Sequence, residues 1–382
     1  MDYNQLTEWM IKARRELHQN PEIAFDERQT ADFVARTLRS FGVEVTEGVG
    51  GTGVVGTLKL GTSNRSIGLR ADMDALRITE ANTNAWASRN QGLMHACGHD
   101  GHTTMLLGAA HLLAAEGGFD GTVRFIFQPA EEKGVGAQAM LDDDLLSRLP
   151  FEEIYGIHNM PGIQVGHVEV RPGAIMAAED NFKIVLHGKG GHASSPHWGS
   201  ETLVPACSLV LDLQTIVSRR LNPSHTAVVS VTEFITDGTR NVLPGVTEIR
   251  GDVRSFDPNV SEQIENEMHR LASGKAAQYG INMEMHYSRE CLPVINDQML
   301  CRDVIAASES VSVHVSGSCA PTTASEDFAR FLKHVPGCYF FIGNGNNSAP
   351  LHNPSYDFND AALLHGAQIH REIVRLRLPV TN

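Results

Sequence analysis

Hydrophobic positions along the chain change their spacing in a way that predicts alternating helices and strands. Between residues 5 and 38 they recur at helical spacing, with a break at 20–22, which predicts two opening helices. Another helical pattern covers about 102–115 and ends at the glycine pair 117–118. Short apolar runs typical of buried strands occur at 53–60, 66–70, 122–127 and 154–158. Strands that alternate with helices predict an α/β fold built around a sheet.

The pattern changes between about residues 181 and 288. The strands expected there are 181–187, 226–234, 246–256 and 281–287, and the expected helices are 202–220 and 260–279. This β-α-β-β-α-β order is the split βαβ arrangement of a ferredoxin-like domain. The α/β pattern then resumes, with a helix near 325–332, a strand at 338–342 and a closing helix near 360–375.

The return of the first pattern predicts that the middle segment is an insertion. We expect a discontinuous larger domain made of 1–179 and 292–382, and an inserted domain at 180–291. With 382 residues, of which 42% are hydrophobic, the chain can bury a core in each domain.

Charge and composition narrow the possible partners. A formal net charge of -14 argues against a nucleic-acid partner, because binding phosphates over a broad surface needs clustered Lys and Arg. The first residues lack the basic start and apolar run of a signal peptide, and no apolar stretch reaches about 18 residues. We therefore expect a cytoplasmic protein without a membrane partner. Its six cysteines show no repeated spacing, so we interpret five as reduced core residues and Cys97 as chemically active.

The strongest chemical pattern lies at 95–102, where three histidines, a cysteine and an aspartate precede a helix. Thiolate and imidazole together suit zinc and similar transition ions. The alternative is a loop whose polar side chains cap the helix. Polar groups of this kind are seldom gathered without a partner, so the cluster as a whole favours a metal site.

A pair of carboxylates, Glu131 and Glu132, follows the strand expected at 122–127. Open α/β sheets place their ligands at the carboxyl ends of strands. Adjacent side chains diverge, so one carboxylate can hold a metal while the other faces a water. The alternative is a solvated acidic turn, and the pair is informative only in combination with the other motifs.

Further candidates also follow predicted strands or lie in loops. His158 ends a strand and His352 lies about ten residues beyond another, although a lone histidine there is more often structural. Asp72 is a reasonable partner for a ligating histidine, whereas Arg70 or Asp74 could form an ordinary ion pair. His192 lies on a glycine-rich loop, which can move toward a ligand or be an exposed turn.

Together these motifs resemble the aminoacylase and carboxypeptidase-G superfamily of dinuclear metallohydrolases. The resemblance is to the branch of hippurate hydrolases, indole-acetyl-amino-acid hydrolases and N-acyl-amino-acid deacetylases, and it covers essentially the whole chain. The matching segments are 70–76, 94–100, 128–132, 190–193, 241–244, 325–328 and 356–360. The resemblance implies a zinc-peptidase-like catalytic domain with a mixed central sheet flanked by helices. It also implies that the inserted ferredoxin-like α+β domain is a lid and dimerisation domain.

The resemblance also implies a role for each candidate residue. Two divalent metal ions, zinc in the first place and manganese or cobalt as alternatives, would be held by Cys97, His99, Glu132, His158 and His352. Cys97 would be shared between the ions, and Glu131 would be the general base. His192 would assist at the carbonyl oxygen in the neighbouring subunit of a homodimer. Asn241 and Arg254 would hold the substrate carboxylate.

The function expected from these roles is hydrolysis of an N-acyl or aryl-acyl amino acid to a carboxylate and a free amino acid. A dipeptidase or an N-acetyl-diamino-acid deacetylase would use the same site, and a binding protein without turnover is an alternative of another class. Arg77 stands where the branch usually has proline, near the expected site, so the substrate preference stays open.

Overall fold

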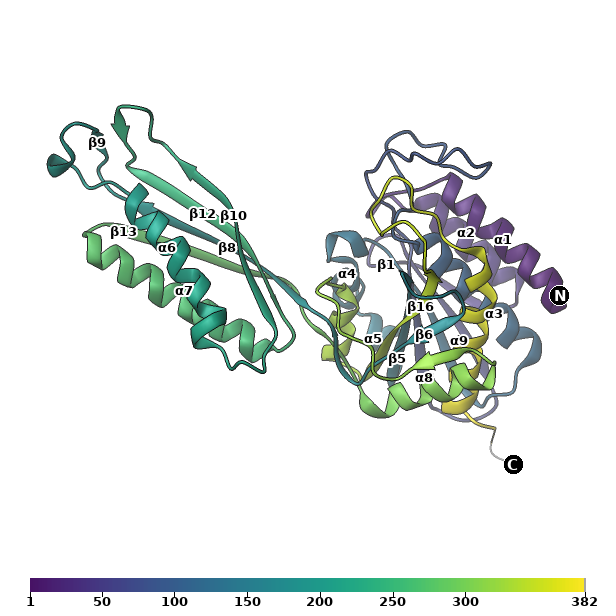
Figure 1. Ribbon diagram of the computed structural model, residues 1–382. Helices are drawn as coiled ribbons and strands as arrows, with labels where there is room; N and C mark the ends of the chain where they lie inside the picture. The colour runs from purple at the N-terminus through teal and green to yellow at the C-terminus, as the bar shows by residue number, and fades with distance from the viewer. Residues whose placement is uncertain (381–382) are drawn as a thin grey trace. The chain divides into compact units, whose positions relative to one another are not determined.

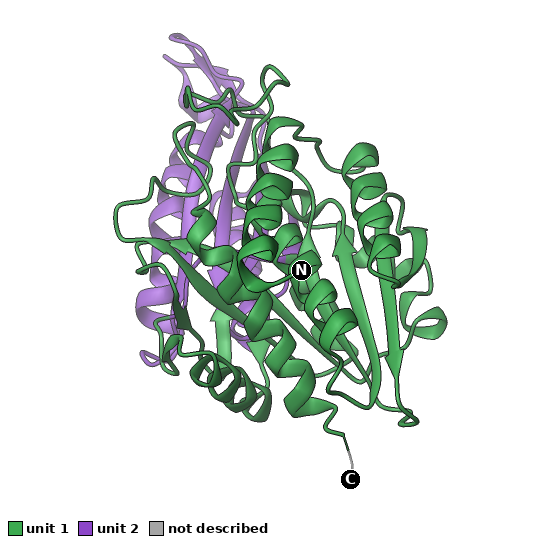
Figure 2. Ribbon diagram, turned by 90° about the vertical axis from the view of Figure 1, so that its right-hand side faces the viewer, with its two compact units in different colours: residues 1–175, 295–320, 327–382 green, residues 176–294, 321–326 purple. Residues whose placement is uncertain are grey.

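The computed structural model describes residues 1–380, and the chain divides into two compact units (Figure 2). Unit 1 contains residues 1–175, 295–320 and the described chain from 327 onward, and unit 2 contains residues 176–294 and 321–326. The expected inserted domain, 180–291, lies within unit 2. The segment 321–326 was expected in the larger domain, but the Ala177 N–H donates to the carbonyl oxygens of Thr322 and Ala324 and so ties this segment to unit 2.

Unit 1 is built on a mixed sheet of eight strands in the order β1-β2-β4-β3-β5-β16-β6-β15. Its centre, β4-β3-β5-β16, is parallel, whereas β1 and β2 are antiparallel to their neighbours. The strand bounds are β1 Glu44–Val49, β2 Gly53–Leu60, β3 Ser66–Asp72, β4 Gly121–Gln128, β5 Glu153–Pro161, β6 His167–Glu169, β15 His314–Ser316 and β16 Gly337–Gly345. The predicted mixed central sheet is confirmed, and the continuous burial of β3 and of most of β5 shows that both faces of these strands are covered.

Helices flank this sheet (Figure 1). They are α1 Tyr3–Gln19, α2 Arg28–Ser40, α3 His99–Glu116, α4 Gly136–Asp142, α5 Leu145–Arg148, α8 Gln298–Ser310 and α9 Leu363–Arg377. α3 is buried along most of its length because α1 and α9 pack closely on it. A Cβ at Gly108 would lie 2.6 Å from the methyl carbon of Met10, so glycine permits this close approach. The helix expected at 325–332 is instead a short 3₁₀ helix, Asp327–Lys333.

Unit 2 has the predicted β-α-β-β-α-β order and its own hydrophobic core. Its antiparallel sheet, in the order β10-β12-β8-β13, consists of β8 Ala178–His187, β10 Ala227–Thr236, β12 Val246–Ser255 and β13 Asn282–Cys291. One face is covered by α6 Leu203–Thr215, which continues as a π-helical turn to Arg220, and by α7 Pro258–Tyr279 (Figure 1). Two short pairs complete the strands: β9 Gly191–His192 with β11 Val242–Leu243, and β7 Gly173–Met176 with β14 Val294–Asn296. Among residues 1–380, none of the helices has the length and apolar character needed to span a bilayer.

Candidate metal centre

Three neighbouring parallel strands end at the candidate site. β3 ends on Asp72, β4 leads through Gln128 into Glu131 and Glu132, and β5 carries His158 near its end. Carboxyl ends of parallel strands meet at one edge of a sheet, which is where ligands bind in open α/β folds. Parallel pairing of β3 with both β4 and β5 therefore brings these segments together.

Gly98, whose backbone is in the left-handed conformation, connects Cys97 to the first residue of α3, His99. Gly98 has φ 93°, and a Cβ there would lie 2.2 Å from Asn159 Nδ2. The same Asn159 Nδ2 donates a hydrogen bond of 2.6 Å to the Cys97 carbonyl oxygen. The backbone conformation and the close approach of Asn159 both require glycine at this position, which in turn places Cys97 and His99.

The five predicted ligands lie in two groups that share Cys97. In the first group, ligand atoms of Cys97, His99 and His158 lie within 4.8 Å of one another. In the second group, those of Cys97, Glu132 and His352 do the same. Cys97 Sγ lies 3.5 Å from His158 Nε2, and Glu132 Oε2 lies 3.4 Å from His352 Nε2. The structure thus collects the whole predicted ligand set around one sulfur atom.

Several of these donor atoms are buried without a hydrogen-bond partner among residues 1–380. They include Nε2 of His99 and Oε1 of Glu132. Leaving a buried polar atom unpaired costs about 1–3 kcal/mol, so such atoms call for a ligand. His158 Nδ1 lies 2.6 Å from the Asn159 carbonyl oxygen, to which it donates, and this directs the lone pair of Nε2 toward Cys97.

The electrostatics of the cluster favour a cation. Burial raises the pKa of the Cys97 thiol, and the negative charges of Glu132 and Glu131 raise it further. Burial lowers the pKa of His99, but Asp72, Asp74 and Glu132 outweigh it and raise that pKa to about 10. The same negative charge would stabilise divalent ions, and bound ions would in turn favour the ionised form of the Cys97 thiol. Sulfur, imidazole and carboxylate donors therefore fit a transition-metal site.

Asp74 holds the turn that carries the two glutamates. Its two carboxylate oxygens accept the backbone N–H groups of Glu131 and Glu132, each at 3.1 Å. Its Oδ1 also lies 3.3 Å from His99 Nδ1. The sequence suggested an ordinary ion pair for Asp74, and the structure shows a link between two parts of the site. Its place within the matched motif at 70–76 was the only indication of this role.

Asp72 contacts two histidines, one of which is a predicted ligand. Its Oδ1 lies 2.7 Å from Nδ1 of His102, which is not a predicted ligand, and its Oδ2 accepts from Arg70 at 2.8 Å. His99 Nε2 is farther away, at 3.8 Å from Asp72 Oδ2. His102 Nε2 in turn accepts the Asn159 backbone N–H. Asp72 therefore belongs to a buried network behind the ligands.

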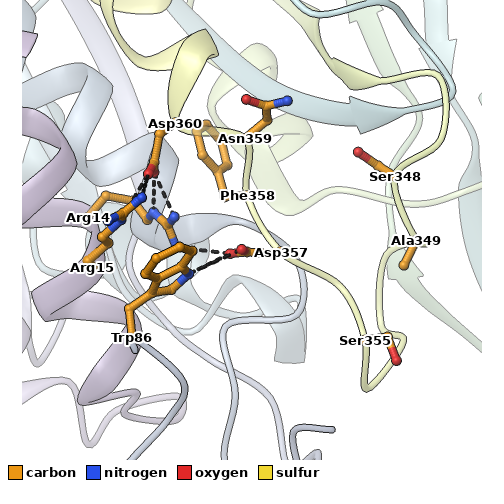
Figure 3. A pocket seen from close by; sticks show the side chains of 10 residues that line it. All are labelled: Arg14, Arg15, Trp86, Ser348, Ala349, Ser355, Asp357, Phe358, Asn359 and Asp360. Carbon is orange, nitrogen blue, oxygen red and sulfur yellow. Dashed lines mark hydrogen bonds and ion pairs between the residues drawn. The ribbon is translucent and has the colours of Figure 1, made fainter. Parts of the chain in front are cut away.

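A second buried network supports the metal loop from α1. Asp100 Oδ2 lies 2.8 Å from His18 Nδ1 and 3.8 Å from Arg14 Nη1. Arg14 also pairs with Asp357 and Asp360, beside a pocket of about 520 Å³ where Trp86 lies under Arg15 (Figure 3). None of the predicted site residues lines this pocket.

The remaining predicted residues belong to unit 2. His192 is exposed on β9, where its Nδ1 accepts the Ser194 N–H, and the Asn241 carbonyl oxygen accepts the Ala193 N–H beside it. Arg254 lies near the other end of β12 and pairs with Glu179 at 3.0 Å.

The structure therefore does not bring Asn241 and Arg254 together as expected. The β9–β11 pair adjoins the start of β12, because β11 ends at Leu243 and β12 begins at Val246. At about 3.3 Å per residue, Arg254 lies about 26 Å farther along β12. Both residues are in the same unit, so one chain cannot place them on one small carboxylate.

A cluster of sulfur, imidazole and carboxylate donors at the ends of parallel strands fits a metal site, and the comparisons show that the protein is a metal-dependent amidohydrolase. Residues 68–376 match Peptidase family M20/M25/M40. The chain belongs to this family, which confirms the resemblance seen in the motifs.

The similarity to related proteins extends over nearly the whole chain. Hippurate hydrolase of Campylobacter jejuni is 38% identical over 368 residues, which cover 95% of this chain and 94% of that protein. Thermostable carboxypeptidase 2 of Saccharolobus solfataricus is 36% identical over 378 residues, which cover 97% and 95%. A solved Bacillus subtilis structure, described as a dinuclear metal binding peptidase from the M20 family, is 32% identical with a TM-score of 0.88 and coverage of 98% and 99%.

Proposed function

We propose that this enzyme hydrolyses the amide bond of N-acyl or aryl-acyl amino acids, releasing a carboxylate and a free amino acid. The observation that carries the proposal is the sharing of Cys97 by two ligand groups with Glu131 beside them. The similarity to a hippurate hydrolase supports the substrate class, since hippurate is an aryl-acyl amino acid.

Two divalent ions would be held by the two groups that meet at Cys97. The ligands would be Cys97, His99, Glu132, His158 and His352. When bound, the ions would polarise the scissile carbonyl and lower the pKa of a water. We propose zinc first because of the thiolate, with manganese or cobalt as alternatives suited to the imidazole and carboxylate donors. The description of the related Bacillus subtilis structure as dinuclear supports two ions.

Glu131 would act as the general base. Its Oε2 lies 3.9 Å from His99 Nε2, and its side chain is 11% exposed, so the carboxylate borders the ligand cluster and still reaches solvent. It would take the proton of the attacking water and return it to the leaving nitrogen, a contribution of about 10²–10⁴-fold.

We propose that unit 2 completes the site through a homodimer. The edge strand β10 exposes Phe234 and Ile235, and α6 exposes Val204 and Leu211, which is 71% exposed. Exposed sheet edges and apolar patches of this kind are association surfaces. The His192 side chain, which hydrogen-bonds only to Ser194 among residues 1–380, would then reach the substrate carbonyl oxygen in the partner's site.

The two residues proposed to hold the substrate carboxylate would also come from different chains of the dimer. Because Asn241 adjoins His192 and Arg254 lies about 26 Å along β12, the two could share a substrate only if they come from different chains. Arg254 would exchange Glu179 for the substrate carboxylate, which a guanidinium can hold with two hydrogen bonds.

The cysteines support a reducing compartment. All six are free thiols, and Cys97 would be lost as a ligand if oxidised. We therefore propose the cytoplasm as the location.

A substrate panel tests the proposal. Protein purified without added metal is analysed for its metal content and assayed with hippurate, N-acetyl amino acids, indole-acetyl-aspartate, an N-acetyl diamino acid and dipeptides. We expect two ions per chain and cleavage of the acyl amino acids. Cleavage of peptides alone would favour a carboxypeptidase-like or dipeptidase activity, in line with the second relative. If metal-loaded protein cleaves nothing on the panel and Glu131→Gln behaves like wild type, the hydrolase proposal is refuted. The remaining hypothesis is then a binding protein without turnover.

A further inference from the structure

Glu27 is a fully buried carboxylate that no motif of the sequence pointed to. It stands directly before α2, but its side chain makes no capping hydrogen bond to that helix. The first turn of α2 is capped instead by Glu22, whose carboxylate accepts the N–H groups of Gln29 and Thr30 at 3.2 and 2.9 Å. Glu27 is therefore free to bond elsewhere. A buried carboxylate is costly unless its hydrogen bonds are satisfied.

Both carboxylate oxygens of Glu27 accept hydrogen bonds from residues outside α2. Oε1 accepts the Ala130 backbone N–H at 2.9 Å, across 103 residues of sequence, and Oε2 accepts the Thr52 hydroxyl at 2.6 Å. The Ala130 contact is notable because the next two residues are Glu131 and Glu132.

Ala130 has a backbone conformation that needs external support. Its φ of 53° and ψ of 36° lie in the left-handed region, which alanine rarely adopts. This conformation turns the chain from the end of β4 into the short 3₁₀ helix that carries Glu131 and Glu132.

Two buried carboxylates hold this turn by three successive N–H groups. Glu27 takes the N–H of Ala130, and Asp74 takes those of Glu131 and Glu132. Glu27 thus holds the residue at which the chain changes direction. A relaxed Ala130 would rotate the two glutamates that follow it.

We propose that Glu27 is a positioning residue that, through the Ala130 backbone, holds Glu131 and Glu132 in the geometry needed for hydrolysis. The proposal rests on the function proposed above for these two glutamates. It requires the reach of the Glu27 side chain and a hydrogen-bond acceptor at its end, but not its charge.

Two substitutions separate reach from charge. Glu27→Gln keeps an oxygen at the same distance, and its amide N–H can donate to the Thr52 hydroxyl. Glu27→Asp keeps the charge but is shorter by one methylene and withdraws from Ala130. Glu22→Ala is the matched control, because it removes a nearby carboxylate whose hydrogen bonds, within residues 1–380, all go to α2.

The test uses the full-length, metal-loaded protein. At saturating metal, we expect Glu27→Asp to lower kcat by about 10- to 100-fold, as misplacement of a catalytic group by about 1 Å can do, with KM nearly unchanged. Glu27→Gln should stay within about threefold of the wild-type kcat, and Glu22→Ala should lower the thermal midpoint without changing kcat. The proposal is overturned if Glu27→Asp keeps the wild-type kcat, if Glu27→Gln is the more impaired variant, or if activity merely follows the folded fraction.

Amide hydrogen exchange gives a readout that does not depend on activity. The Ala130 N–H, followed by mass spectrometry of peptides covering 125–134, should exchange slowly in wild type and Glu27→Gln and faster in Glu27→Asp. Equal protection in all three proteins would refute the positioning role even if no panel substrate were cleaved. An inactive wild type with this exchange pattern would refute the proposed function alone.

Discussion

Substitution of Gly98 by alanine should destabilise unit 1 more than an ordinary glycine substitution does. Gly98 has φ 93°, and alanine in the left-handed region costs about 1–2 kcal/mol. The new Cβ would also lie 2.2 Å from Asn159 Nδ2, so Asn159 must move away from the Cys97 carbonyl oxygen that it bonds at 2.6 Å. An unpaired buried group adds about 1–3 kcal/mol. The expected loss in the free energy of unfolding is about 2–5 kcal/mol.

Gly92 supplies the matched control. It has φ 81°, but a Cβ there would meet nothing within 4 Å, so Gly92→Ala should cost only the backbone strain of about 1–2 kcal/mol. The comparison isolates the close approach at position 98 from the backbone conformation that both glycines share.

Urea unfolding followed by tryptophan fluorescence measures both variants. A Trp198→Phe background leaves Trp9 and Trp86, both in unit 1, as the reporters. A chelator keeps metal binding from adding to the stability. Equal losses for Gly98→Ala and Gly92→Ala would show that Asn159 yields without cost and would refute the reasoning about this loop.

Three further outcomes follow from the site. Glu131→Gln should lower kcat by about 10²–10⁴-fold while keeping the metal content of wild type by elemental analysis; a loss of metal would make Glu131 a ligand instead. Cys97→Ser should weaken both ions together in a competitive chelator titration, because Cys97 belongs to both groups; release of a single ion would contradict the sharing. Burial lowers the pKa of His18, but the negative charge of Asp100 outweighs burial and raises that pKa to about 9. His18 therefore stabilises the fold fully below about pH 6.5, its unfolded pKa, and this contribution is lost as the pH rises through about 9. His18→Gln should flatten the dependence of urea stability on pH in that range, and an unchanged slope would exclude His18 as its source.

The sequence alone was sufficient for most elements of the fold. The run at 66–70 is mostly apolar because a central parallel strand is buried on both faces, so such a strand can be recognised without the structure. The helix and strand order of unit 2 followed from periodicity, because each of its elements buries one face and exposes the other. The ligand-type residues were also identifiable, since polar side chains directly after buried strands must meet at one sheet edge.

The partners of those residues were decided only by the tertiary structure. His102, which is not among the predicted ligands, is the closest imidazole to Asp72, and Arg254 lies far from Asn241 along β12. Glu27 reaches Ala130 across 103 residues, a contact that no pattern in the sequence indicated. Periodicity reports which face of an element is buried, because burial depends on near neighbours in the chain. It does not report which group of a distant segment a buried carboxylate meets, because that depends on how the elements pack.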